Sequence, residues 1–312
     1  MIKGVSVVIC TYNGRNLLKP TFEHLAKQKV TVPLEIVFVD NASTDGSKSF
    51  ADQWWSNNIP DFVSYKSYDQ PIAGKSYAQD LGYSKAKYEY LLVCDDDNWL
   101  SDTYIQTAYD IMDGNSSIGA LGGWCEAEFE VSKPLWFDEY ARYFAVSKQG
   151  AKSGDITKKK GCLYGAGMMI RKSHWVELKS NGFNHMLSCR RGNELSSGGD
   201  TEYCFALRLL GYKIWYDSRL YFKHFMTRNR LNLDYLYRLR KSMVYSNFVL
   251  IAYKDKLRNK TRNRYNFIKS GLNGFPLLYL KKVFDFIFGD EAKQREVKLY
   301  FAKLKYLFFY YA

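Results

Sequence analysis

Apolar and polar positions alternate in blocks along the first hundred residues. Four short runs rich in Val, Ile, Leu and Tyr are each bounded by polar residues, a pattern typical of buried parallel strands. These runs lie at residues 5–10, 34–39, 62–65 and 90–94. Between them, apolar side chains recur every three or four residues and predict helices over 16–29, 47–57 and 76–86. Strand and helix in alternation predict a doubly wound α/β sheet.

Beyond residue 98 the pattern is less regular but still predicts strands and helices. The predicted helices are 100–112 and 201–210, and the predicted strands are 120–131, 163–171, 213–216 and 220–224. Two polar, glycine-rich loops lie at 147–161 and 188–199. Loops of this length in a compact domain usually cover or bind a ligand.

Three acids follow the fourth predicted strand directly, namely Asp95, Asp96 and Asp97. Ligands of open α/β sheets bind beyond the carboxyl ends of the strands, where these residues are expected. Adjacent carboxylates repel one another, and a divalent cation that also binds phosphate oxygens would supply the missing positive charge. Mg²⁺ and Mn²⁺ prefer such oxygen ligands. Taken alone, the triplet is equally consistent with an acidic turn that caps the next helix.

The same sheet edge is expected to collect polar residues from the first two strands. Asp40 ends the second strand and, taken alone, favours a turn or capping role. Thr11, Tyr12 and Asn13 follow the first strand. Because parallel strands end at one edge, these residues and the acidic triplet are predicted to line one cleft.

Two further candidates come from the second half of the chain. Asp200 lies where the second glycine-rich loop becomes a helix. It is therefore either a helix cap or a general base on a loop that closes over substrate. His224 ends the last predicted strand. A single histidine more often has a structural role, but one at a strand end suits the binding of a metal or a phosphate.

Four motifs occur in a fixed order along residues 5–224, and they read VVICTYNG, VFVDNASTDGS, YLLVCDDDN and GGDTEYCFALRLLGYKI. Together they resemble the family 2 glycosyltransferases, which have the GT-A fold. The stretch LSCRRGNELSSGGD is similar to a bacterial subgroup that builds surface polysaccharides. The resemblance implies transfer of a sugar from a nucleotide-sugar donor, UDP-linked by preference, to a hydroxyl of a glycan or lipid-linked acceptor.

The resemblance also assigns roles to individual residues. Asp95 and Asp97 match the outer positions of the D-x-D motif, which together with His224 implies a Mn²⁺ or Mg²⁺ site. Asp200 matches the catalytic base. The residues implied at the nucleotide sugar are Thr11, Tyr12, Asn13, Asp40, Lys75, Asp95, Asp96 and Arg190.

Two positions depart from the family pattern. Gln79 and Asp80 stand where many relatives have Arg and Asn, and Lys75 is expected to supply the missing cation. Gly199 stands in place of the first acid of a Glu-Asp pair, so Asp200 is the only acid of that pair. A single base without a second carboxylate nucleophile predicts single displacement with inversion, the logic of inverting glycosidases.

Composition and charge indicate a second region. Hydrophobic residues make up 46% of the 312 residues and charged residues 25%, which is typical of a folded globular protein. The net charge of +13 is concentrated after residue 222, where 20 Lys and Arg face 6 Asp and Glu. We therefore predict a GT-A catalytic domain over 1–225 and a basic helical region over 226–312.

The basic region is expected to contact an anionic membrane surface. Segments 277–288 and 297–312 interleave aromatic residues with Lys and Arg, as in helices that lie in a membrane interface. The alternative is that these aromatic residues pack on the catalytic domain. Nucleic acid is not an expected partner, because the sequence has no recognised nucleic-acid-binding motif.

The remaining features predict a cytoplasmic protein at the inner face of the membrane. Six cysteines are spread without a C-x-x-C pair, and no run of about eighteen apolar residues occurs. The start of the chain leads directly into a strand rather than a signal peptide. A dinucleotide oxidoreductase is excluded, because G-x-G-x-x-G is missing after the first strand. The main alternative is a non-catalytic nucleotide-sugar binder, which would be expected to lose the acids named above.

Overall fold

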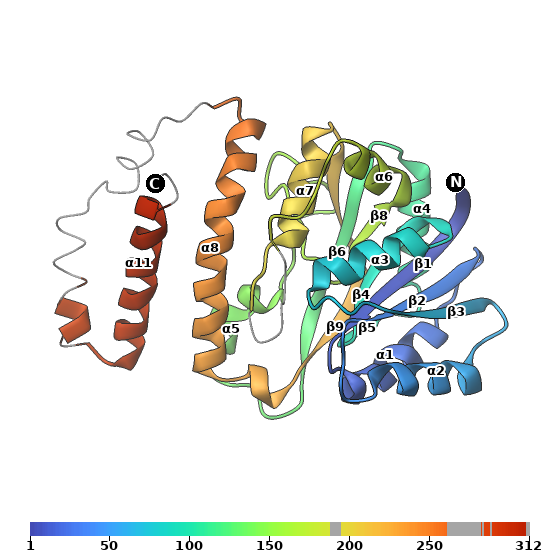
Figure 1. Cartoon of the computed structure of the whole chain (residues 1–312), viewed down its shortest axis with the longest axis horizontal. Coiled ribbons are helices and arrows are strands. Elements are labelled where there is room, and N and C mark those ends of the chain that lie inside the picture. Colours follow the sequence, from blue (N-terminus) through green and yellow to red (C-terminus); the bar gives the residue numbers. More distant parts are fainter. Residues whose placement is uncertain (188–194, 261–281, 283, 288, 310–312) are drawn as a thin grey trace.

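A nine-stranded mixed sheet forms the core of the computed structural model (Figure 1), which describes residues 1–187, 195–260, 282, 284–287 and 289–309. The strand order is β3-β2-β1-β4-β8-β6-β9-β5, and β7 pairs with β9. Strands β1, β2 and β3 thus lie side by side in sequence order, β4 pairs with the other side of β1, and β8 lies between β4 and β6.

The first half of the sheet is parallel and doubly wound, as predicted. Its strands are β1 (Ile2–Thr11), β2 (Leu34–Asp40), β3 (Val63–Asp69) and β4 (Tyr88–Asp95), and its helices are α1 (Arg15–Ala26), α2 (Ser47–Asn58) and α3 (Lys75–Lys85). Successive side chains of β1 point to opposite faces. Val7 and Ile9 join the core under α1 and α2, whereas Val8 packs with residues of α3.

The second half of the sheet is mixed. The strands are β5 (Asn98–Leu100), β6 (Ile118–Phe129), β7 (Gly154–Asp155), β8 (Met169–Arg171) and β9 (Lys213–Met226). The helices are α4 (Tyr104–Gly114), α5 (Phe137–Tyr140), α6 (Lys172–Ser180) and α7 (Gly199–Leu209), with a 3₁₀ turn at Ala141–Phe144. β8 runs antiparallel to both β4 and β6, and β9 runs parallel to β6. The carboxyl ends of β4, β6 and β9 therefore lie at the same edge of the sheet.

One prediction for this half was wrong in an instructive way. The segments 213–216 and 220–224 were predicted as separate strands, but they belong to the single strand β9. Its register against β6 shifts between Gly122 and Trp124, so β9 carries extra residues there and bulges. A Cβ on Gly123 would lie 1.7 Å from the carbonyl oxygen of Leu220. Glycine at this position allows the bulge to press onto β6 without breaking the strand.

Two further predicted elements are shorter than expected. Only Met169–Arg171 of the predicted strand 163–171 is extended and paired, because β8 meets β4 and β6 over a few residues. The predicted helix 100–112 begins at Tyr104, since Asn98–Leu100 pairs with β9 as β5.

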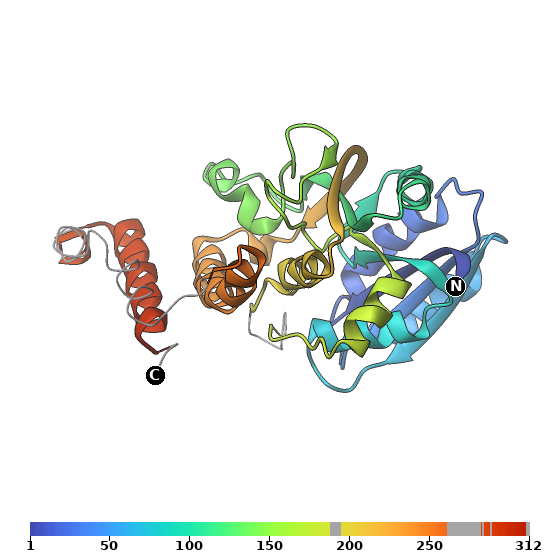
Figure 2. The ribbon, with the colours of Figure 1, turned by 90° about the horizontal axis from the view of Figure 1, so that it is seen from above.

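Two helices follow the sheet (Figures 1 and 2). Helix α8 (Leu233–Leu257) packs against α7 through a cluster that includes Phe205, Val249 and Leu250. Its first turn is capped by the side chain of Asn232, which accepts a hydrogen bond from the Tyr235 amide.

Helix α11 (Glu291–Phe309) packs against α8 through Leu299, and Arg240 of α8 pairs with Glu296. Part of the predicted amphipathic helix 297–312 thus contacts the rest of the protein. Most of the predicted helix 277–288 lies outside the described residues. Among the helices described, none is long and apolar enough to cross a membrane.

Candidate active site

The carboxyl ends of β1, β2 and β4 bring the predicted residues together. Thr11 lies opposite Asp40 in the β1–β2 register, and Cys10 lies opposite Asp95 in the β1–β4 register. Thr11, the last residue of β1, therefore lies between the ends of its two neighbouring strands.

Each acid of the triplet has a different partner. Lys75, at the start of α3, donates to Asp95 Oδ1 over 2.5 Å. Thr11 Oγ1 donates to Asp96 Oδ2, also over 2.5 Å. These bonds come from elements on either side of the triplet, so the tertiary fold supplies the counter-charge and hydrogen bonds that three adjacent carboxylates require.

Asp97 is buried and lies in a small charged cluster. Its Oδ2 atom is 3.2 Å from His224 Nε2 and accepts a hydrogen bond from Arg230 Nη1 at 2.6 Å. Burial by itself would raise the pKa of Asp97, but His224 and Arg230 outweigh it and hold that pKa well below its usual range. The carboxylate is therefore ionised and negatively charged at neutral pH.

The pKa of Asp96 is shifted in the opposite direction. Burial and the charge of Asp97 raise the pKa of Asp96 to about 7, although the hydrogen bond from Thr11 acts against the shift. Gly14 is needed beside it, because a Cβ there would lie 2.2 Å from both the Asp96 carboxylate and the Thr11 hydroxyl. Neighbouring carboxyl groups thus divide into a firmly charged Asp97 and an easily protonated Asp96.

The residues predicted at the nucleotide base surround the ends of β1 and β2. Asp40 is buried, and its Oδ2 accepts from the Ser43 amide at 3.2 Å. Its Oδ1 has no hydrogen-bond partner among the described residues. Tyr12 is 48% exposed, which leaves its ring available for contact with a ligand. Asn13 has a positive φ of 54°, and its side chain instead accepts from the Thr44 amide at 2.8 Å.

Asp200 reaches the same sheet edge from a different direction. It lies in the first turn of α7, one residue inside the helix start, and Gly198 is the capping residue. Its Oδ2 accepts from the Gly165 amide at 2.9 Å and its Oδ1 from the Thr201 amide at 2.8 Å. Since β8 is antiparallel to β4, Gly165 precedes β8 beside the carboxyl end of β4.

One residue of this region, Arg230, was not found from the sequence. Arg230 ends the 3₁₀ turn Arg228–Arg230, beyond the predicted domain boundary, and the only signal in the sequence was a cation six residues after His224. Glu202 is fully buried and accepts hydrogen bonds from the amides of Met186 and Leu187 and from the Tyr253 hydroxyl. It thereby ties the chain before the second glycine-rich loop to α7 and α8. Arg190 lies outside the described residues.

The donor set for a divalent ion is small. Asp97 Oδ2 and His224 Nε2 lie 3.2 Å apart, and their chemistry suits Mn²⁺ or Mg²⁺. Arg230 Nη1 lies 2.6 Å from the first atom and 3.4 Å from the second, so this guanidinium has to move for both to bind one ion. Asp95, the third predicted ligand, is engaged by Lys75. In the part of the chain that the structure describes, no group of three or more such ligands is assembled for a metal. A site with two protein ligands suits a divalent ion that keeps several water ligands and also binds substrate phosphates.

Comparison with known proteins agrees with this architecture. The family model described as glycosyl transferase family 2 matches residues 6–176. Glycosyltransferase GlyG from Streptococcus pneumoniae is 31% identical over 109 residues, which are 35% of this chain and 35% of GlyG. Chondroitin synthase from Escherichia coli is 25% identical over 122 residues, which are 39% of this chain and 17% of the synthase. The matched part thus spans about a third of one relative and less of the other.

Solved structures share the fold at low sequence identity. The mannosyltransferase PcManGT from Pyrobaculum calidifontis, in complex with GDP-Man and Mn²⁺, superposes with a TM-score of 0.59 at 15% identity. That match covers 99% of this chain and 88% of PcManGT. Residues 1–349 of S. aureus TarS, in complex with UDP-GlcNAc, give a TM-score of 0.53 at 13% identity, over 98% of this chain and 91% of TarS 1–349. With the GT-A fold in place and the family match covering more than half of its length, the chain belongs to glycosyl transferase family 2.

Proposed function

We propose that the protein transfers a sugar from a nucleoside-diphosphate sugar, with UDP as the expected nucleotide, to an acceptor hydroxyl in glycan synthesis. The observation that carries the proposal is the gathering of the acidic triplet, two cations and Asp200 at one edge of a GT-A sheet. Similar proteins of known structure are described as bound to UDP-GlcNAc or to GDP-Man.

Donor binding is proposed to use both sides of this edge. Asp40 Oδ1, which is buried and has no hydrogen-bond partner among the described residues, would accept from a donor group of the base, next to the exposed ring of Tyr12. Lys75 and Arg230, which pair with Asp95 and Asp97, lie where a diphosphate would bring negative charge. Arg190 remains a predicted contact of the leaving diphosphate.

A divalent cation is proposed at Asp97 and His224, with Asp95 next to it. When bound, Mn²⁺ or Mg²⁺ would neutralise charge on the departing nucleoside diphosphate. Lys75 and Arg230 act on the same charge by electrostatic attraction. The buried and ionised Asp97 is suited to hold a cation, because its negative charge persists at neutral pH.

Asp200 is proposed as the general base. It takes the proton from the acceptor hydroxyl while the oxygen attacks the anomeric carbon, and the bond to the diphosphate breaks on the opposite face. The nucleoside diphosphate leaves with the electron pair of that bond. The predicted outcome is one displacement with inversion of the anomeric centre.

The test of this function is the variant Asp200→Asn in the full chain. With a panel of nucleotide sugars and glycan acceptors, we expect turnover to fall by about 10² to 10⁴ while donor affinity stays nearly unchanged. Turnover is followed as release of the nucleoside diphosphate, and affinity by calorimetry. Asp61→Asn, at an exposed acid before β3, is the matched control.

If Asp200→Asn kept the wild-type turnover, Asp200 would not be the general base. Donor binding by the wild-type chain without turnover of any panel member would favour the non-catalytic nucleotide-sugar binder.

The region over 226–312 is proposed to hold the catalytic domain over 1–225 at the inner face of the membrane, near a lipid-linked acceptor. Phe284, Phe286 and Ile287 are exposed, as are Lys298 and Lys305 of α11, which is a composition that suits an anionic lipid surface.

Sedimentation with anionic liposomes at low salt tests the membrane proposal, with neutral liposomes alongside. Each lysine near such a surface contributes about 1 kcal/mol. We therefore expect Lys298→Glu with Lys305→Glu to weaken binding at least tenfold. Lys158→Glu with Lys159→Glu, a pair of exposed lysines in the catalytic domain, should not weaken it. If the full-length protein does not bind anionic liposomes, the result would favour the alternative that the aromatic residues of the basic region pack on the catalytic domain.

A further inference from the structure

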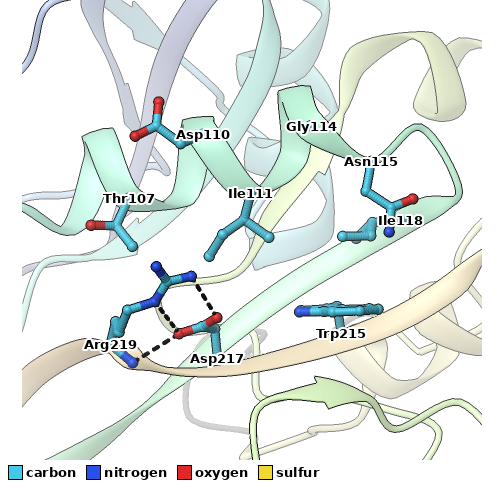
Figure 3. Close-up of a pocket in the computed structure, with 9 residues that line it drawn as sticks. All are labelled: Thr107, Asp110, Ile111, Gly114, Asn115, Ile118, Trp215, Asp217 and Arg219. Atoms are coloured by element: carbon cyan, nitrogen blue, oxygen red, sulfur yellow. Dashed lines mark hydrogen bonds and ion pairs between the residues drawn. The ribbon is translucent and has the colours of Figure 1, made fainter.

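A separate pocket lies at the opposite edge of the sheet, between α4 and the first half of β9 (Figure 3). It encloses about 450 Å³, a size typical of small-ligand sites. Trp215 and Asp217 of β9 lie across it from Ile111 of α4, and Asp110 lies at its rim with its carboxylate pointing away from β9. Trp215 pairs with Leu121 of β6, and His224 pairs with Ala127 six residues further along, so the pocket lies roughly 20 Å from the acidic triplet.

The bulge in β9 shapes this pocket. The shift in register places Asp217 and Arg219 in the extra residues of β9, next to the position where Leu220 presses onto Gly123. Arg219 folds back and donates through both Nε and Nη2 to the carboxylate of Asp217, each over 2.9 Å. Figure 3 shows this ion pair forming one wall of the pocket.

The floor and the rim of the pocket differ in polarity. Ile111 and Trp215 are partly exposed and supply apolar surface, whereas Ile118 is fully buried. Around them lie Asp110 and Asn115, and one side-chain oxygen of each accepts hydrogen bonds from a nearby residue. Asp110 Oδ1 accepts from Gln106 at 2.8 Å, and Asn115 Oδ1 accepts from the Ser117 amide at 3.1 Å.

We propose that this pocket binds a sugar unit of a carbohydrate chain. A pyranose presents a face of C–H groups with slight positive charge, which is attracted to the negative face of an indole ring. Its hydroxyl groups radiate from the edge of the ring. They can donate to the carboxylate of Asp110 and accept from the amide of Asn115, so both parts of the pocket match one ligand.

Charge argues against a phosphorylated ligand. Arg219 is the one cation among the residues that line the pocket, and Asp217 already engages it in two hydrogen bonds. Asp110 adds further negative charge near the same guanidinium. A neutral oligosaccharide therefore fits this pocket better than a nucleotide or another anion.

Through this pocket the protein would bind a glycan at a distance from the site of sugar transfer. This consequence rests on the proposed function, because only a glycan-modifying enzyme needs to hold its acceptor or product at a distance. Carbohydrate binding itself does not depend on it. Binding and turnover are separable measurements, and loss of one without the other distinguishes the two proposals.

The test is saturation-transfer NMR of the full chain with three neutral probes, chitotriose, cellotriose and maltotriose, and with uridine monophosphate for comparison. We expect at least one trisaccharide to show transfer, and Trp215→Ala to abolish it. Trp54→Ala, at a partly exposed tryptophan of α2, should keep the signal. Asp110→Ala, an exposed position that is safe for folding, should weaken binding about threefold to tenfold, the range for one hydrogen bond.

Absence of transfer to all three trisaccharides in the wild-type chain would overturn the proposal. Wild-type affinity in Asp110→Ala, or in folded Trp215→Ala, would do the same. Binding of uridine monophosphate that is lost in Trp215→Ala would assign the pocket to a nucleobase instead. Trisaccharide binding without any transferase turnover would support carbohydrate binding at this pocket and contradict the proposed transferase function.

Discussion

The two edges of the sheet hold their charged side chains in different ways. At the carboxyl edge, Asp95, Asp96 and Asp97 are held by Lys75, Thr11 and Arg230, which are far away in sequence. At the opposite edge, Asp217 is satisfied by Arg219, two residues further along the same strand. Long-range pairs form only when the fold is complete, whereas a local pair needs little tertiary structure. The carboxyl edge should therefore respond far more strongly to the loss of a partner.

Metal removal should produce the largest difference between the edges. With EDTA present we expect turnover of the donor to be abolished, and added Mn²⁺ or Mg²⁺ to restore it, because the ion would neutralise the leaving diphosphate. Trisaccharide binding at the opposite edge should not change. Nucleoside diphosphate release and saturation-transfer NMR measure the two responses. Full turnover in a rigorously metal-free preparation would contradict the proposed ion.

Loss of the long-range ion pair should come next in size. Arg230→Met leaves the buried Asp97 without its guanidinium, and we expect the free energy of unfolding to fall by about 4 kcal/mol. Arg219→Met should cost about 1 kcal/mol, since that guanidinium is 66% exposed and its pair is local. Urea unfolding followed by tryptophan fluorescence measures both values.

A rescue variant sharpens this comparison. Asp97→Asn added to Arg230→Met should recover part of the lost stability, because the uncompensated buried charge is removed. Equal destabilisation by Arg230→Met and Arg219→Met would show that the two edges do not differ in the way described.

A smaller effect than the loss of Arg230 is expected from a buried histidine at the opposite edge. His174 on α6 packs at 3.7 Å, ring centroid to ring centroid, on Tyr212, which precedes β9. Burial, together with the charge of Arg171, lowers the pKa of His174 to about 4. The unfolded chain binds this proton near pH 6.5, so stability is lost as the pH falls from about 6.5 to about 4. We expect a loss of about 2 kcal/mol at pH 4.5.

His174→Phe should remove that part of the acid sensitivity and keep the stacking contact. His24→Gln, at a histidine of α1 outside this contact, is the matched control. Urea unfolding at pH 7 and pH 4.5 measures the change. An unchanged acid sensitivity in His174→Phe would contradict the assignment.

The local pattern of apolar and polar residues was sufficient to predict the parallel half of the fold. The buried runs that became β1, β2 and β4 are short, β-branched and bounded by polar residues, and their observed limits differ from the predicted ones by three residues or fewer. The mixed half was harder. β9 contains a bulge that depends on Gly123 of another strand, and β5 is a strand only because Asn98–Leu100 meets β9.

The sequence by itself determined the family, the doubly wound sheet and the gathering of Thr11, Asp40 and the acidic triplet at one edge. These follow from periodicity and from parallel strands ending together, which are local properties of the chain. The tertiary structure alone decided that Arg230 pairs with Asp97, that the pKa values of Asp96 and Asp97 shift in opposite directions, and that Trp215 faces a pocket. Burial and contacts between residues distant in the sequence set those properties, and the local sequence pattern predicts neither of them.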